Sequence, residues 1–100
     1  TDWRESPAVP VIEGLIARGG DVHYHDDYVP TLELGTHGDG PSMSSTPLDY
    51  DTLGEYDCVV IVTDHGYFDA ARLVAQARRV VDTRNLTGRA GVVDAKVVKL

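Results

Sequence analysis

The chain begins with a helical pattern of hydrophobic positions. Apolar side chains recur at spacings of three, three and one, which predicts one apolar stripe: Val9, Ile12, Leu15 and Ile16. Ser6 followed by Pro7 is a common helix start, and Gly19-Gly20 is a common helix end. Together these features predict a helix over residues 6–19.

Two later segments have the patterns of strands. In residues 21–26, Val22 and Tyr24 alternate with polar residues, which is typical of a short half-buried strand. Residues 58–63 form a continuous, mostly β-branched run, which is typical of a strand buried on both faces of a parallel sheet. Between the two segments, residues 30–57 predict a long loop, with a weak strand near 43–48 and one helical turn around 49–55.

The remaining residues continue the alternation of elements. Residues 67–78 predict an amphipathic helix, residues 79–82 a third strand and residues 85–91 a loop. Residues 92–100 predict a final strand, for which Val97-Val98 are the best candidates.

This order of elements predicts an α/β fold with an open, three-layer, parallel Rossmann-like sheet. A doubly wound unit normally opens with a strand, whereas this sequence opens just before its first helix. We therefore expect a fragment from which the first strand is missing.

Composition agrees with one ordinary globular domain: 100 residues, 42% hydrophobic and 25% charged. The longest apolar run, residues 59–62, is too short to span a membrane, and no signal peptide is visible. The single cysteine, Cys58, fits a reducing compartment and is expected to be a small buried hydrophobe. These features predict a cytoplasmic protein without a membrane partner.

Charge is distributed unevenly along the chain. The formal net charge is −7, and residues 1–70 hold two arginines against fourteen acidic residues. Residues 71–100 hold seven basic residues against two acidic ones. The overall acidity argues against a nucleic-acid partner, whereas the basic C-terminal part can hold a small anion.

Ligands of open α/β sheets bind beyond the C-terminal ends of the strands. Three segments are expected at this edge: residues 1–6, 63–65 and 82–85. Two of them contain an arginine, Arg4 and Arg84, and together they predict an anion-binding rim suited to phosphate.

Each candidate residue has an alternative structural role. Arg84 can bind a diphosphate bidentately, or it can form a salt bridge with Asp82 or Asp64. Arg4 can bind the anion, or it can pair with neighbouring acids or contact another domain. His65 can donate to a phosphate or ribose, or it can orient its own turn.

A metal site is not predicted. His23 and His25 precede Asp26 and Asp27, but a zinc site needs three or four convergent ligands, and exposed histidines on a strand explain the spacing. Asp26 is expected to be a turn residue, because no glycine-rich loop precedes it.

Four short motifs, taken in order, carry a family resemblance: DWRESPA at 2–8, YHDDYVP at 24–30, TDH at 63–65 with Phe68, and DTRN at 82–85. The chain resembles the C-terminal UDP-binding domain of the UDP-glucose/GDP-mannose dehydrogenase family over nearly its whole length. The resemblance implies an enzyme that uses two NAD+ to oxidise the C6 hydroxyl of a UDP-sugar to a carboxylate. It also implies that Arg84 contacts the UDP, and that NAD-binding and central domains of the same chain complete a homodimeric enzyme. Arg4 and His65 are predicted as further UDP-binding residues from their positions in the sequence.

The sequence departs from the family pattern in ways that limit what this segment does alone. The first strand, which ends in a substrate-contacting lysine in the family, is absent, and Asp27 stands where proline is usual. No GxGxxG is present to bind NAD, and Cys58 lies outside a glycine-rich cysteine motif, so no catalytic residue is assigned. The alternative function is a free-standing binding or receiver-like regulatory module with Asp64 as its acceptor, although the paired acids of a receiver are missing.

Overall fold

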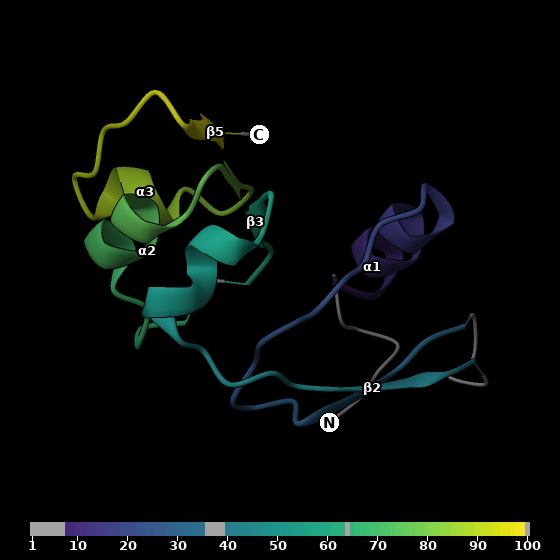
Figure 1. The fold of residues 1–100 in the computed structure, drawn as a ribbon. Coiled ribbons are helices and arrows are strands. Elements are labelled where there is room, and N and C mark those ends of the chain that lie inside the picture. The colour runs from purple at the N-terminus through teal and green to yellow at the C-terminus, as the bar shows by residue number, and fades with distance from the viewer. Residues whose placement is uncertain (1–7, 36–39, 64, 100) are drawn as a thin grey trace. The chain divides into compact units, whose positions relative to one another are not determined.

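The computed structural model describes residues 8–35, 40–63 and 65–99. The chain divides into two compact units, Thr1–Leu48 and Asp49–Leu100 (Figure 1). Each unit has its own elements and its own core.

The first unit begins with α1 (Ala8–Ala17), which lies within the predicted helix. The helix ends as predicted at Gly19-Gly20: Gly19 has a φ of +89°, and its N–H donates to the carbonyl of Ile16. The predicted start at Ser6-Pro7 lies outside the described residues.

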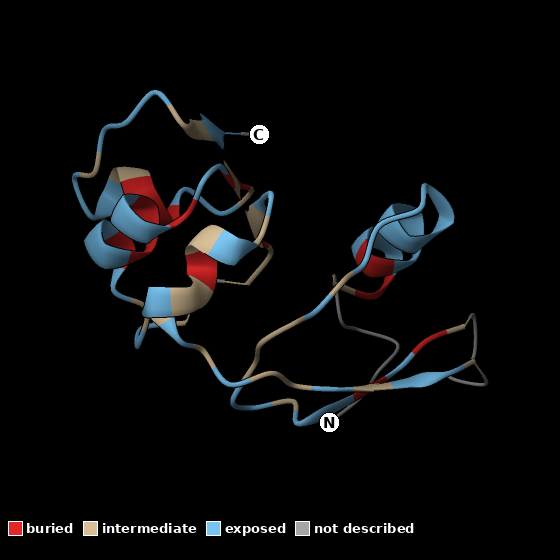
Figure 2. Cartoon of the chain, in the orientation of Figure 1, coloured by how far each residue is buried: buried red, intermediate tan, exposed pale blue. Residues whose placement is uncertain are grey.

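Only half of the predicted apolar stripe of α1 is buried. Val9 and Ile12 form a core with Leu32 and Leu34, and these buried segments are red in Figure 2. Leu15 and Ile16, the other two residues of the predicted apolar stripe, are 40% and 44% exposed. In the described part of this unit, the buried partners of the helix are Leu32 and Leu34, and they cluster with its first half.

The predicted strand over residues 21–26 is also wrong, because this segment has no regular secondary structure. The strands of this unit are β1 (Thr31–Glu33) and β2 (Ser42–Ser44), which pair antiparallel with Leu32 opposite Met43. β1 falls inside the predicted loop, and β2 overlaps the weak strand predicted near 43–48.

The second unit alternates helices and strands in the predicted order. Its elements are η2 (Tyr50–Glu55), β3 (Val59–Ile61), α2 (Ala70–Gln76), β4 (Val80–Asp82), α3 (Leu86–Arg89) and β5 (Val97–Lys99). The three strands form a parallel sheet in the order β3-β4-β5. The predicted α/β class with a Rossmann-like parallel sheet is confirmed, and α3 replaces part of the loop predicted over 85–91.

The core of the second unit lies around β4 and α2. Val80 is completely buried, and Leu73, Val74 and Ala77 are almost completely buried. Both ends of α2 are capped: the Asp69 side chain accepts from the N–H of Arg72, and Lys96 Nζ donates to the carbonyls of Val74 and Ala77.

Two expectations for the second unit fail near β3. Cys58 is exposed instead of buried, and Val59 and Val60 are only half-buried. In the described part of the chain β3 pairs with β4 alone, so one side of this strand lacks the neighbour that would complete its burial. No described helix is long and apolar enough to cross a membrane.

Candidate functional site

The three parallel strands of the second unit end at one edge of their sheet. Their register aligns Ile61 with Asp82 and Asp82 with Lys99. The loops after β3 and β4 therefore leave the sheet next to each other, beside the end of β5. We call the residues at these strand ends the carboxyl edge: His65, Thr83, Arg84, Asn85 and Lys99.

Thr83 connects the ends of β3 and β4. Its N–H and its Oγ1 both donate to the carbonyl oxygen of Ile61, at 3.1 and 2.7 Å. This pair of bonds fixes the backbone from which the following residue, Arg84, extends.

Asp82 organises the turn between β4 and α3. Its completely buried carboxylate accepts from the N–H groups of Arg84 (3.0 Å), Leu86 (3.1 Å) and Thr87 (2.8 Å) and from the Thr87 hydroxyl (2.7 Å). Burial alone raises the pKa of this carboxyl group, but the hydrogen bonds outweigh burial and lower the pKa below its ordinary value. Asp82 is therefore an anion stabilised inside the protein.

The backbone N–H and the backbone carbonyl of Arg84 are both hydrogen-bonded, whereas its side chain is exposed. Its N–H donates to Asp82 Oδ1, and its carbonyl accepts from Arg89 Nη2 at 3.2 Å. The alternative of a salt bridge to Asp82 is wrong, because that carboxylate is bonded to backbone N–H groups and to Thr87. Within the described residues the Arg84 guanidinium forms no ion pair, and Asp64 lies outside them.

Asn85 makes the turn sharp. Its backbone adopts the left-handed helical conformation, with φ 58° and ψ 31°, and it is the N-cap residue of α3. Asparagine tolerates this conformation better than most side chains. Its carbonyl accepts from the N–H of Arg89 at 3.1 Å and from Arg89 Nε at 3.3 Å.

The structure brings two of the three predicted UDP-contacting residues to the same sheet edge. His65 lies in the loop after β3, with its ring stacked on Tyr67 at 5.2 Å and tilted against Phe68 at 5.6 Å. The His65 carbonyl accepts from the Phe68 N–H, which closes the turn. Arg4 lies outside the described residues. The ligand-binding roles of all three residues stay predictions.

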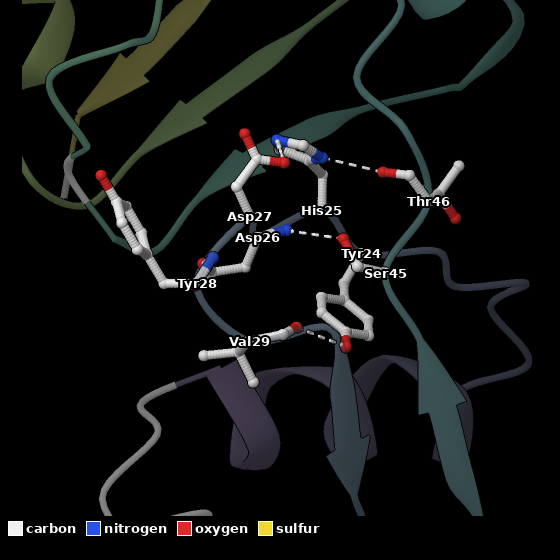
Figure 3. Close-up of polar contacts among 8 residues, drawn as sticks. All are labelled: Tyr24, His25, Asp26, Asp27, Tyr28, Val29, Ser45 and Thr46. Atoms are coloured by element: carbon white, nitrogen blue, oxygen red, sulfur yellow. Dashed lines mark hydrogen bonds and ion pairs between the residues drawn. The ribbon is translucent and has the colours of Figure 1, made fainter. Parts of the chain in front are cut away.

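The YHDDYVP motif forms a separate network in the first unit (Figure 3). The Tyr24 hydroxyl donates to the Val29 carbonyl at 2.9 Å, and the Asp26 N–H donates to Ser45 Oγ at 2.9 Å. Burial, assisted by the Asp26 charge, raises the pKa of Tyr24. Asp26 Oδ1 accepts from the Tyr28 N–H at 2.8 Å, so the prediction that Asp26 is a turn residue is confirmed.

The two histidines of this region face different carboxylates. His25 Nε2 lies 3.7 Å from Asp27 Oδ1, and its Nδ1 lies 2.8 Å from the Thr46 carbonyl (Figure 3). His23 Nε2 lies 3.6 Å from Asp21 Oδ1. In the described ranges no three metal-binding side chains converge on one point.

A model of the UDP binding domain of the UDP-glucose/GDP-mannose dehydrogenase family matches residues 1–89. The chain belongs to this family, and the matched part is its UDP-binding domain. No curated protein and no solved structure matched the chain. The family resemblance expected from the four motifs is thereby confirmed.

Sequence reasoning missed the residues that build the β4–α3 turn. Asp82 was expected as a possible partner of the Arg84 side chain, whereas it binds the backbone of the turn. The order Asp82, Asn85, Thr87 carried a usable signal, because these residue types hydrogen-bond nearby backbone and favour turns. The position of Lys99 depends on the register of β5, which the sequence pattern does not give.

Proposed function

We propose that the chain binds the UDP part of a UDP-sugar at its carboxyl edge, within an NAD-dependent enzyme that oxidises the sugar C6 hydroxyl to a carboxylate. The family match supports UDP as the ligand. The observation that carries the location is the turn held by Asp82, which fixes the backbone of an exposed arginine at the ends of parallel strands.

Arg84 is the residue best suited to the diphosphate. A guanidinium presents two parallel N–H donors to phosphate oxygens, and charge-assisted bonds of this kind are stronger than neutral ones. Because Asp82 and Arg89 bind the backbone of Arg84, the turn is ordered before the ligand arrives. Less conformational entropy is then lost on binding.

His65 and Arg4 have supporting roles in this proposal. The imidazole of His65, held in its turn beside Tyr67 and Phe68, can donate to a ribose or phosphate oxygen. Arg4 stays a predicted UDP contact from the sequence alone, because it lies outside the residues that the structure describes.

The residues of this chain do not fit NAD. The connection between β3 and α2 contains a single glycine, Gly66, and the sequence contains no GxGxxG. We expect NAD and the catalytic cysteine to be held by other domains of the enzyme, with the central domain forming a homodimer in the cytoplasm. The receiver-like alternative is disfavoured by the family match.

Enzyme activity tests this proposal. The full-length protein should reduce NAD+ with at least one UDP-sugar, among which UDP-glucose is tested first, and not with GDP-mannose. The 100-residue chain alone should reduce no NAD+ with any of these sugar nucleotides. The absorbance of NADH reports both results, and boiled protein is the control. Activity with GDP-mannose alone, or activity of the isolated chain above the boiled control, would contradict the proposal.

A further inference from the structure

The two lysines of the β5 region have different surroundings. Lys96 precedes the strand, is partly buried and donates through Nζ to two carbonyls at the end of α2, at 2.9 and 3.0 Å. Lys99 is the last residue of the strand and is exposed. It lies at the carboxyl edge, in register with Asp82.

The Lys99 side chain extends over the first turn of α3. A Cβ atom at Gly88 would lie 2.8 Å from Lys99 Nζ and would also contact Asn85 Oδ1. Because Gly88 has no side chain, the ammonium group of Lys99 and the amide of Asn85 can both lie close to its Cα atom. Asn85 directly follows Arg84 in the chain. The Lys99 ammonium therefore lies next to the turn that carries Arg84, the residue proposed to bind the diphosphate.

Positive charge accumulates around Asn85. Arg84 precedes it, Arg89 donates to its carbonyl, and Lys99 lies beside its side chain over Gly88. Asp82 is the nearest acid on these elements, and it is completely buried by its bonds to the turn. In the described residues no carboxylate pairs with Lys99. Like charges held together repel each other, and a bound anion relieves this repulsion.

We propose that Lys99 is a further ligand-binding residue, which contacts the second phosphate of the diphosphate while Arg84 contacts the first. This inference rests on the proposed function and adds to it a residue beyond the matched range, 1–89. Gly88 keeps open the space that the Lys99 ammonium shares with the Asn85 amide oxygen.

The experiment compares Lys99→Met with Lys96→Met in the full-length protein, using UDP and UMP as probes in calorimetric titrations. Methionine retains an apolar stem and removes the charge. Lys99→Met should weaken UDP binding roughly three- to tenfold, as an exposed charge-assisted contact does, and UMP binding by clearly less. Lys96→Met should lower the melting temperature and leave the ratio of UDP to UMP affinity unchanged.

Two further variants separate binding from folding. Lys99→Arg should retain most of the UDP affinity, because the charge remains. Gly88→Ala should also weaken UDP binding, because its methyl group displaces the Lys99 ammonium together with the Asn85 amide.

Two results overturn the role of Lys99 while leaving the proposed function intact. One is a Lys99→Met protein that binds UDP as tightly as wild type. The other is an equal loss of UDP and UMP affinity accompanied by a lower melting temperature. A wild-type protein that binds neither UDP nor UDP-glucose would instead overturn the proposed function itself.

Discussion

At the scale of single residues, Asp82 is the centre of the proposed site although it does not face the ligand. A buried carboxylate is unfavourable unless hydrogen bonds replace its hydration. Three backbone N–H groups and the Thr87 hydroxyl provide this replacement, and the same bonds fix the chain on both sides of Arg84 and Asn85. The stability of the turn and the backbone position of the proposed UDP-binding residue, Arg84, therefore depend on one side chain.

Replacing Asp82 with asparagine should destabilise the protein by about 1–3 kcal/mol at pH 7, because the amide NH2 would face backbone donors instead of accepting from them. The pKa of Asp82 is lower in the folded protein than the ordinary value of about 3.9. Its stabilising contribution is present above that ordinary value and is lost as the pH falls through the lower, folded-state pKa.

Urea unfolding between pH 7 and pH 2.5 measures this contribution. The difference between wild type and Asp82→Asn should be constant from pH 7 to pH 5 and should shrink at lower pH. Thr87→Val, which removes only the hydroxyl donor, should cost about 1 kcal/mol. A pH-independent difference between wild type and Asp82→Asn would contradict a depressed pKa.

At the scale of elements, α1 shows how two glycines in one helix region act in opposite directions. Gly14 lies within the helix, and a Cβ atom there would meet nothing within 4 Å. Gly19 lies just beyond the helix end with a φ of +89°, a conformation that side chains disfavour. The same substitution should therefore have opposite effects at the two positions.

Gly14→Ala should stabilise the protein by about 0.5–1 kcal/mol, because alanine favours the helix and restricts the unfolded chain. Gly19→Ala should destabilise it by about 1 kcal/mol, because alanine must adopt a positive φ. Chemical denaturation of both variants, measured against wild type, checks the pair. Destabilisation by Gly14→Ala would show that the helix does not continue through this position in solution.

The elements also show where sequence patterns are informative. The helix α2 and the parallel strands of the second unit were predictable, because spacing and β-branched runs report burial in these elements, whereas α3 lies in a segment predicted as a loop. The strand predicted over 21–26 failed because Tyr24 and Asp26 bond to residues that flank β1 and β2, and the segment pairs with neither strand as a regular ladder. These partners are Val29, Ser45 and Thr46. Of the site, Arg84 was predictable from its place after β4, whereas Lys99 required the register of β5.

At the scale of the whole molecule, the unit Asp49–Leu100 contains both Arg84 and Lys99, in a sheet of three short parallel strands. Most of the basic residues of this acidic chain lie in its last thirty positions. The proposed anion site therefore lies in the basic part of the sequence, whereas we expect the NAD site on another domain. UDP binding and NAD binding should respond differently to changes at the carboxyl edge.

Calorimetric titration of UDP into the full-length Arg84→Ala protein tests the central claim most directly. The loss of a charge-assisted bond of about 1.5–3 kcal/mol should weaken UDP binding roughly 10- to 150-fold. Arg84→Lys should recover only part of that affinity, because an ammonium group cannot donate two parallel hydrogen bonds to the phosphate as a guanidinium does. Arg79→Ala, which changes an exposed arginine just before β4, should leave UDP affinity unchanged, and NAD+ affinity should stay constant in every variant. If UDP binds Arg84→Ala as tightly as wild type, Arg84 does not hold the diphosphate and the assignment of the site is wrong.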